Sequence, residues 1–515
     1  MSLRKQVLKG TASVALGEGI GYAASFLRNM ILARLLSKAD FGMAAVFGMV
    51  MSLLEFTAKL GVGRFLIRDK EGDDPTFVAT GHTVQAVAAA ISAACILAFA
   101  PLLARWFGIA EHAWALMILA GIVLLRGLQH LDVQRFERHL RFGPSAAVEA
   151  VPQLIITLAA WPLAVWLRDY RAVLILLVAK ALLSFVLSHW LAEQEYRLTW
   201  KPEYGHRMLQ FGWPLLLTGF LMFGIMQGDQ FLVATFYSMS DLAPYAAAVT
   251  LVMAPQFVWG RVFNSVAFPL VARVQDNPTM FALRYRQVLG VMTLYATVST
   301  AALMTGAEAL MRCVYGPKYI GAGLLMAWLA AVAAFRALRM AVAVANLAKG
   351  DSQSQLLSNL GRASSLLPAF WLASQGQPLW TVAACGLLGE LVATGICVWR
   401  LRSLYGLAPG LSLGAVVGTA GLAAACGWLG HQVATWPSWA ALGLAALAAF
   451  GSGIATVALR RELRAEVNAL LGRFQSVGLR AALQSWWTMS RQSGAATGAP
   501  SGQLMDRRQY VGDKA

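Results

Sequence analysis

The sequence predicts an all-α polytopic membrane protein with about 14 transmembrane helices, arranged as two pseudo-symmetric six-helix lobes plus two extra helices. Three observations lead to this prediction. Of the 515 residues, 58% are hydrophobic and only 13% are charged, which is too apolar for a soluble chain of this length. Apolar runs of about 20 residues, each long enough to cross a bilayer as a helix, recur along almost the whole chain. The sequence lacks the alternating polar and apolar pattern of barrel strands.

The apolar runs give the expected membrane helices in chain order. They lie approximately at residues 10–33, 41–60, 80–102, 113–131, 145–167, 172–192, 208–237, 242–266, 287–311, 320–345, 355–374, 378–399, 410–430 and 436–458. The charged segment 193–206 separates two sets of six runs, so we expect an N-terminal lobe at 1–192, a cytoplasmic loop, and a C-terminal lobe at 207–402. Residues 403–459 hold the last two runs. Residues 460–515 form a basic cytoplasmic tail that we expect to be amphipathic first and disordered toward its end.

A weak internal sequence repeat supports the division into two halves. At an offset of 201 residues, five positions of segment 33–56 are identical to positions of segment 234–257. The pairs are Ala33 and Ala234, Ser37 and Ser238, Asp40 and Asp241, Ala45 and Ala246, and Phe56 and Phe257. Both segments fall at the external turn between the first two helices of a half. We therefore expect parallel repeats, related by an axis along the membrane normal, with a substrate site between them.

The net charge of +17 is explained by membrane topology. Lys and Arg gather in the even-numbered loops, as they should if the N-terminus is cytoplasmic. These loop cations are Arg64, Arg68, Lys70, Arg135, Arg138, Arg141, Arg197, Lys201, Arg207, Arg273, Arg284, Arg286, Lys349, Arg362, Arg400 and Arg402. Both termini are therefore expected in the cytoplasm, and the charge does not require a nucleic-acid partner.

Motifs of enzymes and cofactor sites do not fit this chain. A GxSxG pattern at Gly410–Gly414 opens an expected membrane helix, whereas a nucleophile elbow needs a strand before it. The sequence has no P-loop and no HExxH, and its five cysteines lack the CxxC spacing of zinc sites. We expect no enzyme activity, no cofactor and no metal.

Polar and ionisable side chains inside the expected spans mark the candidate site. A charged residue in a bilayer is costly unless it has a partner or faces a wet cavity. The first run carries a polar stripe at helical spacing, formed by Glu18, Tyr22, Ser25, Arg28 and Asn29. We expect this stripe to face the interior of the bundle.

Further charged candidates lie in the later spans. They are Arg126, Lys180, Arg261, Arg336 and Arg339, with the acids Glu149, Asp229 and Glu390. Arg336 and Arg339 lie one turn apart and share a helix face. Asp229 is at the repeat-equivalent position of Arg28, and we expect the two residues on facing surfaces of the lobes, where they help form an outer gate. Because cations outnumber acids, the interior should attract a phosphate, a pyrophosphate or an acidic sugar.

A series of short motifs occurs in order along residues 1–402. They are Leu35-Leu36-Ser37, Asp40-Phe41-Gly42, Gly61-Val62-Gly63, Leu66-Ile67-Arg68, Glu137-Arg138 with Leu140-Arg141-Phe142 and Glu149, Phe211-Gly212-Trp213-Pro214, Asp229, Tyr245, Phe268-Pro269, and Tyr315-Gly316 with Tyr319 and Ala322. In this order and spacing, the motifs resemble the polysaccharide transporter family, the lipid-linked oligosaccharide flippases of the MOP superfamily.

The resemblance implies export of undecaprenyl-pyrophosphate-linked oligosaccharide across the bacterial inner membrane by alternating access, for exopolysaccharide, capsule or O-antigen synthesis. Its implied partners are the lipid-linked oligosaccharide, membrane lipids, and polymerase and other glycan-assembly proteins. Arg28 matches the arginine often found in the first helix of the family, so it is the leading head-group candidate, and Arg261 is the second. Proton coupling through Glu18, Asp229 or Glu390 is left open. Two alternatives also stay open: a cation-coupled multidrug or small-molecule exporter of the same superfamily, and a non-transporting membrane scaffold.

Overall fold

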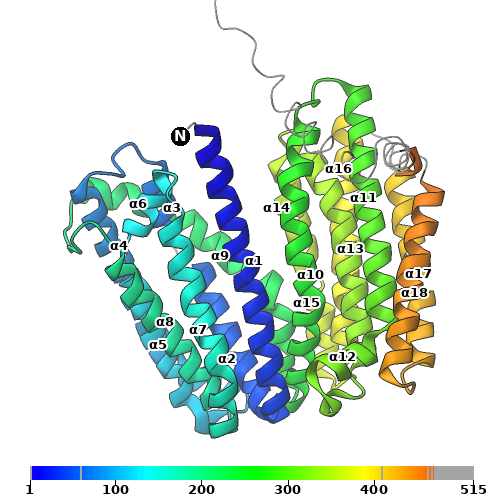
Figure 1. The fold of residues 1–515 in the computed structure, drawn as a ribbon, viewed down its shortest axis with the longest axis horizontal. Helices are drawn as coiled ribbons and strands as arrows, with labels where there is room; N and C mark the ends of the chain where they lie inside the picture. Colours follow the sequence, from blue (N-terminus) through cyan, green and yellow to red (C-terminus); the bar gives the residue numbers. More distant parts are fainter. Residues whose placement is uncertain (1–2, 58–60, 407–409, 461–462, 466–467, 469–515) are drawn as a thin grey trace, which may run out of the picture. The chain divides into compact units, whose positions relative to one another are not determined.

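The computed structural model describes residues 3–57, 61–406, 410–460, 463–465 and 468. Over these residues every regular element is a helix (Figure 1). Contacts divide the chain into one unit at Met1–Thr456 and a second at Val457–Ala515. The tail predicted at 460–515 lies almost wholly outside the described residues.

The helices follow one another with short connections. The first half of the chain contains α1 (Leu3–Leu35), α2 (Lys38–Thr57), α3 (Val62–Arg68), α4 (Pro75–Trp106), η1 (Ala110–His112), α5 (Ala113–Gly127), α6 (Asp132–Arg138), α7 (Gly143–Leu167) and α8 (Arg171–Trp190). The second half contains α9 (Pro202–Phe236), α10 (Met239–Ala272), α11 (Pro278–Thr305), α12 (Ala307–Tyr315), η2 (Pro317–Tyr319), α13 (Gly323–Ala348), α14 (Ser352–Ala363), α15 (Leu366–Ser374) and α16 (Leu379–Tyr405). The last two helices are α17 (Gly410–Gln432) and α18 (Ser438–Leu459).

The helices coincide with the predicted membrane spans. In the described part of the chain, 11 helical segments are long and apolar enough to cross a membrane, as judged by length and composition. They are α4, α5 with η1, α7, α8, α9, α10, α11, α13, α16, α17 and α18. Helices α1 and α2 occupy the first two predicted spans. The predicted span 355–374 is divided into two helices, α14 and α15, and this break shapes the site described below.

The two halves repeat the same neighbour relations. In the first half, α4 packs on α5, α5 packs on α8, and α7 packs on both α1 and α8. In the second half, α11 packs on α13, α13 packs on α16, and the α14–α15 pair packs on both α9 and α16. Across the halves, α2 contacts α9 and α10 contacts α1 (Figure 1). A two-fold relation between parallel repeats produces reciprocal contacts of this kind. The residue limits of the two lobes stay a prediction.

The repeated sequence segment forms the same helix start in both halves. At α2, the backbone N–H of Asp40 donates to Ser37 Oγ at 3.1 Å, and Ser37 Oγ donates to the Asp40 carboxylate. At α10, Ser238 and Asp241 form a capping box with the equivalent bonds. Such a cap satisfies backbone N–H groups that the first helical turn leaves free. The repeated Ser and Asp residues therefore specify where the second helix of each half begins.

The halves are joined where α1 ends and α2 begins. Arg34 Nε donates to the backbone carbonyl of Val314 at 2.7 Å, and its Nη2 donates to the carbonyl of Cys313. Lys318 Nζ donates to the carbonyls of Leu36 and Arg34, the second at 3.2 Å. Two cations thus tie the α1–α2 turn to α12 and η2 of the other half.

Close backbone approach also holds the halves together at this end. A Cβ atom on Gly42 in α2 would lie 1.9 Å from the carbonyl oxygen of Met239 in α10, so the two helix starts touch. Just beyond this contact, the largest apolar cluster includes side chains of both halves, among them Phe47 and Leu242, which are fully buried. Close van der Waals packing of this kind stabilises contacts between helices in a membrane.

The last two helices pack on the second half. Helix α17 contacts α11 and α13, and the hydroxyls of Thr456 in α18 and Thr297 in α11 lie 2.9 Å apart. Neither helix carries an Asp, Glu, Lys or Arg. The charged candidate residues therefore all belong to the two repeated halves.

Candidate functional site

The polar stripe predicted in the first span lies on α1, which is a single uninterrupted helix. Tyr22, Ser25, Arg28 and Asn29 therefore share one side of this helix. The guanidinium of Arg28 donates from Nη2 to Ser25 Oγ at 3.5 Å. The side chain of Glu18 lies outside the described residues.

Helix α1 meets α10 at an aromatic contact between the halves. The ring of Tyr22 stacks on the ring of Phe257, with centroids 5.8 Å apart and an interplanar angle of 12°. The guanidinium of Arg261 lies over the same Tyr22 ring, 5.9 Å from its centroid. Arg261 is exposed, although it lies well inside a helix long enough to cross a membrane. A cation at such a position normally faces a wet cavity or a partner rather than lipid. The contact therefore places two predicted cations, Arg28 and Arg261, on helices that meet across the halves.

Two other predicted cations form ion pairs within the first half. Arg126 in α5 donates to Glu55 in α2 at 2.6 Å, and Lys180 in α8 donates to Glu149 in α7 at 3.3 Å. The side chains of Glu55 and Glu149 are 50% and 75% exposed, so neither pair is buried in the protein. Exposed pairs of this kind contribute little to stability.

A buried cluster of charges lies in the second half. Glu390 in α16 pairs with the Nε atoms of Arg336 at 2.8 Å, Arg339 at 2.9 Å and Arg362 at 2.9 Å. The side chains of Glu390, Arg339 and Arg362 are 2%, 6% and 8% exposed. One carboxylate thus compensates three guanidinium groups, which leaves an excess of positive charge inside the helix bundle. This charge must be balanced because an uncompensated charge at that depth is strongly destabilising.

Arg362 reaches this cluster because its span is broken between α14 and α15. Ser365, the N-cap residue of α15, donates its Oγ to the carbonyl of Arg362 at 2.8 Å. Helix α16 approaches the break at Gly389, where a Cβ atom would lie 2.7 Å from Ser365 Oγ and 2.8 Å from the Arg362 carbonyl oxygen. Only glycine leaves room for this approach, which brings Glu390 to the break. Transporters often use discontinuous helices to place polar groups and helix ends inside the membrane.

Asp229 in α9 lies beside the same cluster. Its Oδ2 accepts a hydrogen bond from the hydroxyl of Tyr245 in α10 at 2.9 Å, and Tyr245 is fully buried. Asp229, Tyr245, Arg336, Arg362 and Glu390 all line a cavity of about 60 Å³. The cavity is lined by residues of α9, α10, α13, α14, α15 and α16. It therefore belongs to the second half alone.

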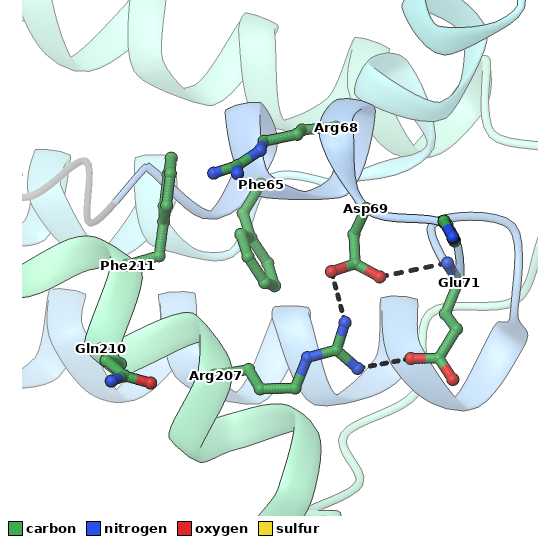
Figure 2. A pocket seen from close by; sticks show the side chains of 8 residues that line it. Phe65, Arg68, Asp69, Glu71, Arg207, Gln210 and Phe211 are labelled. Atoms are coloured by element: carbon green, nitrogen blue, oxygen red, sulfur yellow. Dashed lines mark hydrogen bonds and ion pairs between the residues drawn. The ribbon is translucent and has the colours of Figure 1, made fainter. Parts of the chain in front are cut away.

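A larger pocket, of about 640 Å³, lies between α3, the loop that follows it, and the start of α9. Figure 2 shows the guanidinium of Arg207 between the carboxylates of Asp69 and Glu71, and each bond is 2.5 Å long. The guanidinium of Arg68 lies over the Phe211 ring, 5.8 Å from its centroid. Charges of both signs thus line this pocket. Its ion pairs join Arg207 of α9 to the loop after α3.

The structure brings some predicted residues together and separates others. Arg336, Arg339 and Glu390 meet in one buried cluster. In the described residues Arg28 bonds to Ser25 while Asp229 bonds to Tyr245, so the gate between Arg28 and Asp229 stays a prediction.

Sequence reasoning missed three residues of these contacts, namely Glu55, Tyr245 as a partner of Asp229, and Arg362. Arg362 was counted with the loop cations, although it lies inside the apolar run 355–374. A cation inside an apolar run was the signal that could have placed it in the cluster.

Comparison with known proteins identifies the family. Residues 31–323, more than half of the chain, match the family described as polysaccharide biosynthesis protein. The chain belongs to this family. No curated protein sequence matches it. The family resemblance drawn from the motifs is thereby confirmed.

Over most of its length, the chain is similar in structure to two solved transporters. The lipid II flippase MurJ, in an inward closed conformation, is 11% identical with a TM-score of 0.67, and the match covers 87% of this chain and 99% of that chain. An inward-facing multidrug resistance MATE family transporter of the MOP superfamily is 14% identical with a TM-score of 0.60, and the match covers 75% of this chain and 94% of that chain. This family member therefore has the predicted MOP-type fold. With its many long apolar helices, it is a multi-pass membrane protein.

Proposed function

We propose that this protein is a flippase that moves undecaprenyl-pyrophosphate-linked oligosaccharide across the bacterial inner membrane, for exopolysaccharide, capsule or O-antigen synthesis. The observation that carries the proposal is the placement of Arg28 and Arg261 on α1 and α10, the helices that meet across the halves around the stacked Tyr22 and Phe257 rings. Guanidinium groups bind phosphate oxygens through paired hydrogen bonds, which suits a pyrophosphate head group. Membership of a polysaccharide biosynthesis family supports this class of substrate.

Transport by alternating access would use the two halves as the moving parts. In one state Arg28 and Arg261 accept the pyrophosphate and sugar head from the cytoplasmic side, while the lipid tail stays in the bilayer. Release on the other side requires the contacts of Arg34 and Lys318 to separate. Both termini would lie in the cytoplasm. Polymerase and other glycan-assembly proteins are the proposed partners on the product side, and no chemical bond changes during transport.

The test is complementation of a flippase-null bacterial strain, read out as surface glycan. Wild-type protein should restore export. Arg28→Ala and Arg261→Ala should each reduce it by about tenfold or more, because each removes a charge-assisted contact to phosphate. Arg105→Gln removes one exposed cation from the end of α4 and should export normally. Normal export by both alanine variants at wild-type protein levels would show that the head group binds elsewhere.

A second candidate is cation-coupled export of small molecules. The observation that favours it is the Asp229–Tyr245 hydrogen bond inside the second half, since a carboxylate within a span is a common ion-coupling group. This candidate predicts that expression raises resistance to lipophilic drugs in an exporter-deficient strain and that Asp229→Asn abolishes the resistance. The flippase proposal predicts no change in resistance. A non-transporting scaffold would leave both glycan export and drug resistance unaffected by Arg28→Ala.

A further inference from the structure

The buried cluster in the second half holds more positive than negative charge. Arg336, Arg339 and Arg362 are opposed by the carboxylates of Glu390 and Asp229, so the group carries an excess of one positive charge when every member is ionised. The cluster lies among helices long enough to cross a membrane, and Arg339, Arg362 and Glu390 are buried. An excess charge in such surroundings calls for a counter-ion.

The pairing geometry shows where the excess lies. All three Nε atoms pair with Glu390. The remaining groups differ: Arg339 Nη1 donates to Ser358 Oγ at 3.2 Å, and Arg336 Nη1 contacts the sulfur of Met253 at 3.2 Å. Among the described residues, the two Nη atoms of Arg362 have no partner, although its side chain is only 8% exposed and lines the cavity. Arg362 is therefore a buried cation with unused donors beside the cavity.

The helix break places the start of α15 beside the cavity. Ser365 and Leu366, the N-cap and first residue of α15, line the same cavity. The Ser365 side chain does not cap α15, because its Oγ donates back to the carbonyl of Arg362. At this helix start the backbone N–H groups of Ser365 and Leu367 donate to the carbonyls of Arg362 and Ser364, both at 3.2 Å, and Pro368 has no N–H. The groups that can hold an anion here are therefore the guanidinium groups.

The cavity size limits the ligand. At about 60 Å³ the cavity holds a few water molecules, since each needs roughly 10–15 Å³ of such space. A halide with one or two waters fits this volume, whereas a sugar pyrophosphate does not. The site is thus separate from the head-group contacts proposed on α1 and α10.

We propose that this cavity binds a small monovalent anion, chloride in the cell, held by the guanidinium groups of Arg362 and Arg336. The anion balances the excess charge and fastens the broken span α14–α15 to α16. This inference does not depend on which substrate the protein transports, and its test measures no transport.

The test is thermal unfolding of the purified full-length protein in detergent, in mixtures of sodium chloride and sodium gluconate at constant ionic strength. Chloride bound only by the folded state should raise the Tm by about 1–3 °C for each tenfold increase above its dissociation constant. Arg362→Gln should abolish the rise. Asp229→Asn removes a lining carboxylate and should shift the rise to lower chloride. Arg105→Gln, which removes one exposed cation elsewhere, should behave like wild type.

A Tm that is the same in chloride and gluconate overturns the proposal, and so does a chloride-dependent rise that persists in Arg362→Gln. If Arg362→Gln does not fold, crystals of the wild-type protein grown in bromide decide the question. A bromide anomalous peak in the cavity within hydrogen-bond distance of Arg362 supports the site, and a cavity without such a peak overturns it.

Discussion

Glu390 and Arg362 pair at 2.9 Å across the break between α14 and α15, so a carboxylate of one span is held by a cation at the discontinuity of another. The same carboxylate also holds Arg336 and Arg339. Packing of α14 and α15 against α13 and α16 therefore depends on one buried acid. Loss of that acid should destabilise the second half more than loss of any exposed acid.

We expect Glu390→Gln to lower the free energy of unfolding by roughly 3–5 kcal/mol, because it leaves two buried guanidinium groups, of Arg339 and Arg362, and the part-buried one of Arg336 without their carboxylate. The measurement is thermal or denaturant unfolding of the purified protein. Glu149→Gln is the matched control, since Glu149 pairs with Lys180 but its side chain is 75% exposed. The control should change stability by no more than about 1 kcal/mol. Equal effects of the two variants would contradict a central role for Glu390.

Gly42 permits the closest contact between the two halves. Gly42→Ala would put a Cβ atom 1.9 Å from the Met239 carbonyl oxygen, so the starts of α2 and α10 must move apart. We expect a destabilisation of about 1–3 kcal/mol and a loss of transport. Gly48→Ala in the same helix is the control, because nothing lies within 4 Å of its Cβ position. Alanine there should be neutral or should stabilise α2 by up to about 1 kcal/mol. If Gly42→Ala exports glycan as well as Gly48→Ala does, the contact is not needed for closure.

The sequence was sufficient for the helical fold and for much of the charged cluster, because both follow from local patterns. Apolar runs gave the spans, and the Ser37–Asp40 and Ser238–Asp241 pairs gave equivalent helix starts. Arg336 and Arg339 were placed on one face by helical spacing alone. The break at Ser365 was not predicted, although Pro368 lies inside the apolar run 355–374 and, having no N–H, cannot donate to the carbonyl of Ser364. Because the break was not predicted, Arg362 was assigned to a loop, and its pairing with Glu390 was not predicted either.

The stability of the first half should depend on pH through His130, which lies in the loop between α5 and α6. Its Nδ1 accepts from the backbone N–H of Asp132 at 3.0 Å, its ring lies 4.7 Å from that of His82, and its Nε2 is buried without a partner among the described residues. Burial lowers the pKa of His130, and the nearby Asp132 carboxylate offsets this only in part. Burial alone would raise the pKa of Asp132, but bonds from Arg135 and from the backbone N–H groups of Glu193 and Gln194, in the loop after α8, lower it below its usual value.

The sign of the pH effect follows from these shifts. Near pH 6 the unfolded state binds a proton at residue 130 more readily than the folded state does, so the contribution of His130 to stability is present above pH of about 6.5 and is lost as the pH falls below it. The contribution of Asp132 is lost only at lower pH, below about 4. The Tm should therefore fall as the pH is lowered from about 7 to 5. His130 should lower the free energy of unfolding by at most about 1.4 kcal/mol for each pH unit in this range. His130→Gln should flatten the curve, and His206→Gln, at an exposed position, should not. An unchanged slope in His130→Gln would assign the effect to other groups.

Arg34 and Lys318 hold the end of α1 against α12 and η2, and both donate to backbone carbonyls of the opposite segment. Replacing both with methionine keeps the aliphatic stems and removes these bonds, which should favour the state in which this end is open. The reporter is Phe41→Cys, since Phe41 is 6% exposed and its ring packs edge-on against Tyr319 at 6.5 Å. The exposed Cys95 and Cys313 are replaced by serine in all variants.

Maleimide labelling of the reporter should become about fivefold faster in the double-methionine variant, which corresponds to a shift of about 1 kcal/mol. This magnitude allows for the exposure of Arg34, where solvent competes for the same hydrogen bonds. Arg105→Gln with the same reporter should label at the original rate. The variant should also export less glycan, because a protein that stays open at this end returns slowly to the state that accepts substrate. Unchanged labelling with reduced export would mean that Arg34 and Lys318 act on the substrate and not on the closure of this end.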